Sequence, residues 1–109
     1  MEKNTDMDWV SMSDVAIIEE LGRRIKEYRL RKRYTQQELA DRAGISLFSI
    51  SKIEKGQAVS VSILIPVLRV LRLLDNLEMF LPEPGISPIA VMKLKGKMPR
   101  RIKRKNNTT

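Results

Sequence analysis

Two short helix signals lie on either side of a single glycine, and this spacing restricts the fold more than any other feature of the chain. Thr35 and Glu38 have the spacing of a capping box, in which each side chain bonds a backbone N–H group at a helix N-terminus. Gly44 suits the left-handed residue that ends a helix, and Ser46 can cap the helix that follows. That second helix stops at Gly56. The sequence therefore predicts two short helices joined by a tight turn.

Further helix signals flank this pair. Upstream, Ser13 can cap a helix whose apolar residues recur mostly every three or four positions, which is the amphipathic α pattern. Downstream, Ser60 or Ser62 can cap a fourth helix that runs to about Leu71. A short fifth helix is expected around residues 75–80. The predicted fold class is therefore all-α, with five helices.

Two residues fit the fourth helix poorly. Pro66 lies several residues inside it, where it removes a backbone hydrogen bond and is expected to kink the helix. Arg72 follows the end of this helix, where glycine would suit the turn.

The predicted organisation of the chain is a flexible N-terminal arm over 1–12, a helical domain over 13–81, a Pro-rich linker with a short helix over 82–96, and a disordered basic tail over 97–109.

Composition removes several classes of function. The chain has no Cys and no His, which excludes thiol catalysis, disulfides and Cys/His zinc sites. No carboxylate pair, Ser/Lys pair or glycine-rich phosphate loop stands out, so neither an enzyme nor a cofactor is predicted. The apolar runs are too short and too interrupted to span a membrane, and the acidic N-terminus does not resemble a signal peptide. We therefore expect a cytoplasmic protein.

The charge is strongly asymmetric along the chain. The net charge is +8, yet residues 1–20 hold six acids against one Lys, whereas residues 91–109 hold eight Lys or Arg and no acid. Such asymmetry favours a polyanionic partner, most often nucleic acid. The tail is open to three interpretations: it contacts phosphates or the minor groove, it docks on a protein, or it is simply disordered. Its candidate residues are Lys97, Arg100, Arg101, Lys103, Arg104 and Lys105.

The third predicted helix has two distinct sides. At 100° per residue, Ile50 and Ile53 lie close together and define the buried side. The opposite side carries Phe48, Ser51, Lys52 and Lys55. Leu47 lies between the two sides, so it either packs beside the second helix or reaches outward with the others.

The stretch LGRRIKEYRLRKRYTQQELADRAGISLFSISKIEKG resembles the Cro/repressor-type helix-turn-helix family, also called the xenobiotic-response-element family, over roughly residues 18–81. The resemblance implies a compact, lambda-repressor-like domain of five helices. Such a domain inserts its third helix into the major groove of double-stranded DNA, usually as a homodimer on a palindromic operator. It also implies a partly buried ion pair between Arg29 and Glu54 that ties the first helix to the third.

Candidate DNA contacts follow from this arrangement. Phe48 and Leu47 can touch thymine methyl groups, while Ser51 and Lys52 can bond base edges. The N-terminus of the second helix is expected to bind a phosphate, and the resemblance favours Gln36 there. The residues expected on the DNA backbone are Arg33, Thr35, Gln36, Gln37, Ser46 and Lys55.

Three functions stay open from the sequence. The first is a sequence-specific transcriptional repressor. The second is an antitoxin that also represses its own operon, because FLPEPGISPIAVMKLKGK resembles the C-terminal extension of HipB-type regulators of HipA-like kinase toxins. The third is a protein-interaction module without DNA binding, in which Phe48 is a hot spot. Candidates for a dimer interface are the apolar residues Trp9, Val10, Leu73, Leu77, Phe80 and Ile89.

Overall fold

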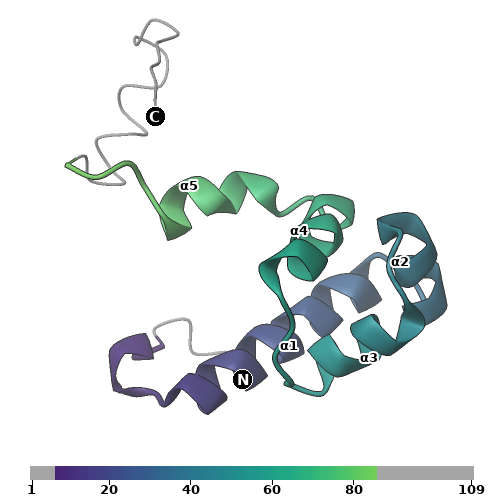
Figure 1. The fold of residues 1–109 in the computed structure, drawn as a ribbon, viewed down its shortest axis with the longest axis horizontal. Helices are drawn as coiled ribbons and strands as arrows, with labels where there is room; N and C mark the ends of the chain where they lie inside the picture. The colour runs from purple at the N-terminus through teal and green to yellow at the C-terminus, as the bar shows by residue number, and fades with distance from the viewer. Residues whose placement is uncertain (1–6, 86–109) are drawn as a thin grey trace, which may run out of the picture. The chain divides into compact units, whose positions relative to one another are not determined.

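The computed structural model describes residues 7–85, and every regular element in that span is a helix (Figure 1). The α-helices are α1 (Asp14–Arg31), α2 (Gln36–Ala43), α3 (Leu47–Glu54), α4 (Val61–Val70) and α5 (Leu77–Phe80), and two 3-10 helices are η1 (Trp9–Ser11) and η2 (Leu74–Asn76). The prediction of an all-α fold with five α-helices is confirmed. The chain divides into two compact units, of which the first ends at Leu74 and the second begins at Asp75.

The helix starts follow the capping residues found in the sequence. The Ser13 hydroxyl accepts the N–H of Ala16 at 3.1 Å, and the Ser46 hydroxyl accepts the N–H of Ser49 at 3.0 Å. Thr35 forms the complete capping box of α2. Ser60 caps α4 through its backbone alone, because its hydroxyl bonds that of Ser62. Local sequence therefore determines where most of these helices begin.

The core of the first unit lies between α1, α2, α3 and α4. Helix α2 packs against α3 and α4, while α1 packs against α3. The buried apolar side chains are Ile25, Leu39, Ala40, Ile50, Ile53, Val67 and Leu71. Leu73, expected as an exposed candidate for an interface, instead lies partly buried against this core. The aliphatic core therefore fixes α3 from the side that carries its two isoleucines.

Glycines allow α1 and α3 to approach each other closely. A Cβ atom at Gly22 would overlap the carbonyl oxygen of Ile53 and lie 3.4 Å from the Cα of Gly56. A Cβ at Gly56 would lie 2.7 Å from Cγ of Glu19, and Gly56 has a φ of 80° that favours glycine in any case. In the sequence, Gly56 indicates the end of a helix, whereas no local pattern shows which segment Gly22 contacts. The two glycines together set the spacing between α1 and the C-terminal half of α3.

Two turns place arginine where glycine is usual. Arg33, after α1, has a φ of 62°, and Arg72, after α4, has a φ of 64°. In both turns the following residue donates its N–H to a carbonyl five residues earlier, at 3.2 Å for Tyr34 and 2.8 Å for Leu73. These are the bonds of a helix end that normally contains a left-handed glycine. The sequence indicated the problem at Arg72 but not the one at Arg33.

The fourth helix continues through its proline. Pro66 lies inside α4, which extends four residues beyond it to Val70.

The fifth helix predicted over residues 75–80 is present as η2 followed by the four-residue α5. None of the helices described between residues 7 and 85 is long and apolar enough to cross a bilayer.

Part of the predicted N-terminal arm has regular structure. Residues 9–11 form η1, and the Arg24 guanidinium lies 4.9 Å from the centroid of the Trp9 ring. Arg24 also bonds Glu20 at 2.8 Å, and Arg23 does the same. Hydrogen bonds from these two guanidiniums lower the pKa of the Glu20 carboxyl from 4.5 to about 2, and the bond from Arg23 has the larger effect. Trp9 thus contacts α1 through a cation–π interaction with Arg24, whose guanidinium is also bonded to Glu20.

Several sequence predictions fall on residues that the structure does not describe. They are the short helix after Pro84, the interface candidate Ile89, and the basic tail over 97–109. The domain boundaries assigned there stay predictions.

Candidate nucleic-acid interface

Helix α3 buries one side and exposes the other. The residues Ile50 and Ile53 are 1% and 4% exposed, whereas Phe48 is 71% exposed. Leu47 is 43% exposed, which fits its place between the two sides. A phenylalanine side chain with this exposed fraction buries little apolar surface, so it contributes little to the stability of the fold. The exposed side of α3 is therefore available for a partner.

Two of the outward residues of α3 interact with each other. The Lys52 ammonium lies 5.9 Å from the centroid of the Phe48 ring, one helical turn away. At this distance the ring attracts the cation and restricts where the long lysine side chain can go. Ser51 is half-buried beside them and Lys55 is exposed after the last turn. The exposed side thus presents an aromatic ring, a hydroxyl and two cations.

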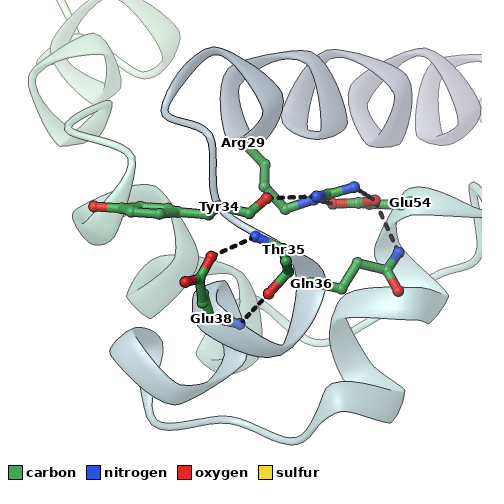
Figure 2. Close-up of polar contacts among 6 residues, drawn as sticks. All are labelled: Arg29, Tyr34, Thr35, Gln36, Glu38 and Glu54. Atoms are coloured by element: carbon green, nitrogen blue, oxygen red, sulfur yellow. Dashed lines mark hydrogen bonds and ion pairs between the residues drawn. The ribbon is translucent and has the colours of Figure 1, made fainter.

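The last residue of α3 is held by a buried ion pair (Figure 2). Arg29 donates Nε–H to Oε2 of Glu54 at 2.7 Å and Nη2–H to Oε1 at 3.0 Å. It also donates Nη1–H to the carbonyl oxygen of Tyr34 at 2.7 Å. The side chains of Arg29 and Glu54 are only 8% and 3% exposed. The bidentate contact with Glu54 links α1 to α3, and the bond to Tyr34 links α1 to the turn that leads into α2.

The side chain of Gln36 joins the same ion pair. Its Nε2–H donates to Oε1 of Glu54 at 2.9 Å, as the dashed line in Figure 2 shows. The sequence predicts that this glutamine turns outward to a phosphate. It does not predict the bond to Glu54, because the two residues lie 18 positions apart and no local pattern connects them. Only the arrangement of α2 beside α3 brings them together.

The other polar groups around α2 and α3 are largely used for capping. The Thr35 hydroxyl accepts the N–H of Glu38 at 3.0 Å, and the Gln37 amide bonds Asp41 at 2.9 Å. Ser46 donates its hydroxyl to Ser49 at 3.0 Å. Thr35 keeps its hydroxyl proton as a further donor, and each glutamine keeps a second amide N–H. The backbone N–H groups of the first turn of α2 add more donors.

Cations gather in the turn between α1 and α2. Arg31, Lys32 and Arg33 are exposed, and in the described part of the chain none of them forms an ion pair with an acid. Arg42, by contrast, lies 4.5 Å from the centroid of the Tyr34 ring. The turn therefore places three positive charges just before the N-terminus of α2, where anions are favoured.

Residues 25–74 match the protein family described as helix-turn-helix. The matched segment begins within α1, contains α2, α3 and α4, and ends where the first compact unit ends. The match confirms the resemblance to helix-turn-helix regulators over these residues and supports DNA binding and transcription regulation as the general class of function. A comparison of the chain with curated proteins found no match.

Proposed function

Because residues 25–74 match a helix-turn-helix family, we propose that the protein is a sequence-specific DNA-binding repressor that inserts α3 into the major groove. The observation that carries the proposal is the two-sided character of α3. Its isoleucine side is fixed in the core, and its other side presents the exposed Phe48 and the half-buried Lys52. We further propose a homodimer on a palindromic operator, because two copies of a short recognition helix read two half-sites about one helical turn apart.

Base recognition is assigned to the outward residues of α3. Phe48 and Leu47 supply apolar surface for the C5-methyl groups of thymine, which project into the major groove. Ser51 and Lys52 supply hydrogen bonds to base edges. The Phe48 ring favours an outward position of the Lys52 ammonium, so these two residues are proposed to read neighbouring bases.

Backbone recognition is assigned to the residues that surround the α2 N-terminus. Its exposed N–H groups and helix dipole attract a phosphate. Arg33 and Lys55 add charge, while Thr35 and Gln37 add neutral donors. Ser46 is proposed to act through the N-terminus of α3, which it caps, and not through its hydroxyl proton, which is donated to Ser49. These contacts position the protein but carry no sequence information.

The base-reading role is tested with Phe48→Ala. The variant is expected to bind its preferred operator about 1–3 kcal/mol more weakly, roughly 5- to 160-fold, because a base contact is lost. Binding to a random duplex is expected to stay close to wild type. Fluorescence anisotropy with DNA from upstream of the chain's own gene, and with a shuffled duplex, measures both. Val15→Ala removes an apolar side chain of similar exposure from α1 and serves as the control. Equal losses on both duplexes in Phe48→Ala would rule out base reading.

The backbone role is tested at Arg33, whose left-handed conformation opposes its charge. Arg33→Gly is expected to raise the free energy of unfolding by about 0.5–1 kcal/mol, because glycine adopts a positive φ without strain. The same change is expected to weaken binding to specific and random DNA alike. The slope of log K against log salt should become shallower by about 0.9, the value for one phosphate contact. Urea denaturation and a salt titration measure the two effects.

Arg72→Gly is the matched control for Arg33→Gly. It relieves the same backbone strain, at a φ of 64°, in the turn after α4. Its stability is expected to rise by a similar amount while its salt slope stays at the wild-type value. A wild-type slope in Arg33→Gly as well would remove Arg33 from the set of phosphate contacts.

An antitoxin remains the second candidate function, on the strength of the sequence after Phe80. FLPEPGISPIAVMKLKGK is similar to the extension of HipB-type regulators, and most of it lies outside the described residues. A kinase-like reading frame next to this gene, whose product co-purifies with the chain on operator DNA, would favour the antitoxin. A repressor without such a neighbour would bind its operator alone.

A further inference from the structure

The carboxylate of Glu54 receives three N–H bonds in a buried site. Two come from Arg29, at 2.7 and 3.0 Å, and the third comes from Gln36 at 2.9 Å. With its side chain 3% exposed, Glu54 has little access to water, so these donors replace its hydration. Only the nitrogen of the Gln36 amide can donate to a carboxylate, which fixes the orientation of that amide.

Gln36 connects two helix ends that the proposed function uses together. It is the first residue of α2, and Glu54 is the last residue of α3. Figure 2 shows the glutamine side chain extending from the start of α2 toward Glu54 beside the Arg29 guanidinium. The start of α2 provides the backbone N–H groups for a phosphate, and α3 provides the residues for the bases. The Gln36–Glu54 bond therefore joins the phosphate-binding end of α2 to the recognition helix.

A direct phosphate contact by the Gln36 side chain competes with this bond unless it uses the amide N–H that Glu54 leaves free. To turn outward, the amide would leave Oε1 of Glu54 with Arg29 Nη2 as its remaining side-chain donor. Loss of a hydrogen bond to a buried charged group weakens the fold more than loss of an exposed one. Gln37 makes no hydrogen bond to a buried charge in the described structure, since its amide bonds the exposed side chain of Asp41 in the same helix. Of the two neighbouring glutamines, Gln37 can turn to DNA without losing a hydrogen bond to a buried charge.

We propose that Gln36 is a positioning residue, whose amide holds α3 at a fixed angle to the N-terminus of α2 through Glu54. The inference rests on the proposed function, because the angle matters only if both helices contact one DNA duplex. It assigns Gln36 to specificity: a change at Gln36 misaligns the base-reading side of α3 while the phosphate-binding backbone of α2 remains. Its effect must therefore pass through Glu54.

A carboxyl–amide exchange between the two positions tests the proposal. Gln36→Glu places a second carboxylate against Glu54, and it is expected to lower specific DNA affinity by roughly tenfold or more and to lower the urea midpoint of the free protein. The double variant Gln36→Glu/Glu54→Gln restores one carboxylate and one amide beside Arg29. Positioning predicts that the exchange recovers most of the specific affinity and most of the urea midpoint.

A phosphate contact by the side chain predicts the opposite result. The carboxylate that Gln36→Glu introduces would repel a phosphate whatever stands at position 54, so the double variant would bind DNA as poorly as the single variant. That outcome, with the two changes acting additively on the urea midpoint, would overturn the proposal. Gln37→Met is the matched comparison: its losses on the operator and on random DNA are expected to be equal, whereas Gln36→Met is expected to lose affinity mainly on the operator.

The design separates this proposal from the proposed function. If the wild-type chain binds its upstream DNA no better than a shuffled duplex, sequence-specific repression is wrong. The urea midpoints of the wild type, Gln36→Glu, Glu54→Gln and the double variant still show whether Gln36 and Glu54 are coupled. If the wild type is specific and the two residues are uncoupled, DNA recognition stands and the positioning role falls.

Discussion

Replacing Gly22 with alanine is expected to lower the free energy of unfolding by at least about 2 kcal/mol, because the new methyl group would overlap the backbone of α3. In an exposed helix interior the same change would stabilise the protein, since alanine is the better helix former by about 1 kcal/mol. Here the obstacle is the carbonyl oxygen of Ile53, which cannot rotate out of the way as a side chain can. The two helices must separate or shift to accommodate the methyl group. Urea denaturation followed by circular dichroism measures the loss.

Two further substitutions isolate the cause. Lys26→Ala changes an exposed residue one turn along α1, so it is expected to alter stability by no more than about 0.5 kcal/mol. Gly44→Ala introduces backbone strain at a φ of 72° but meets no atom within 4 Å, so it is expected to cost about 1–2 kcal/mol. A Gly22→Ala protein as stable as wild type would mean that α1 and α3 are farther apart than described. Specific DNA binding is expected to fall with Gly22→Ala, since the shift displaces α3, the proposed recognition helix.

The parts of the fold that sequence predicted well depend on local hydrogen bonds. Ser13, Thr35 and Ser46 cap helices with side chains that bond N–H groups three residues away, so neighbouring letters contain the whole interaction. The inward side of α3 was predicted for a similar reason. The period of an α-helix sets Ile50 and Ile53 on one side and Phe48 on the other.

The features that sequence did not predict depend on contacts between distant segments. Gly22 reads as an ordinary helix residue until Ile53 is placed against it. Gln36 reads as an exposed amide until Glu54 lies beside it. Arg33 shows a further limit: arginine has no preference for a positive φ, and the turn imposes one through hydrogen bonds of the neighbouring backbone. Of these three features, only Gly22 has a signal in the sequence, because a glycine inside a helix often indicates a close contact with another segment.

Helix α3 is therefore positioned by two kinds of contact near its C-terminal end. The Gly22 contact controls how closely α3 approaches α1, and it tolerates no added atom. The ion pair between Arg29 and Glu54 controls how its last turn is oriented, and Gln36 extends that control to α2. Phe48, at the opposite end of the helix, depends on both contacts for its direction.

Breaking the ion pair is the second change with a large expected effect. Arg29→Met or Glu54→Met alone is expected to lower the free energy of unfolding by about 3–5 kcal/mol, because each leaves a buried charge without its partner. The double variant is expected to lose less than either single variant, because it leaves no unpaired charge. Some loss remains in the double variant, since the Tyr34 carbonyl and the Gln36 amide also lose a partner. Urea denaturation of the four proteins gives the coupling energy directly.

The two readouts of this cycle separate stability from recognition. If the pair only stabilises the fold, the double variant recovers specific DNA affinity in proportion to its recovered stability. If the pair orients α3, the double variant folds well but still discriminates poorly between operator and random DNA, because methionines cannot reproduce the two-pronged bond of Arg29 or the bond of Gln36. Additive losses in stability would mean that the two side chains do not interact in solution. We expect recovered stability without recovered specificity, since directional hydrogen bonds, unlike apolar burial, determine the angle of the helix.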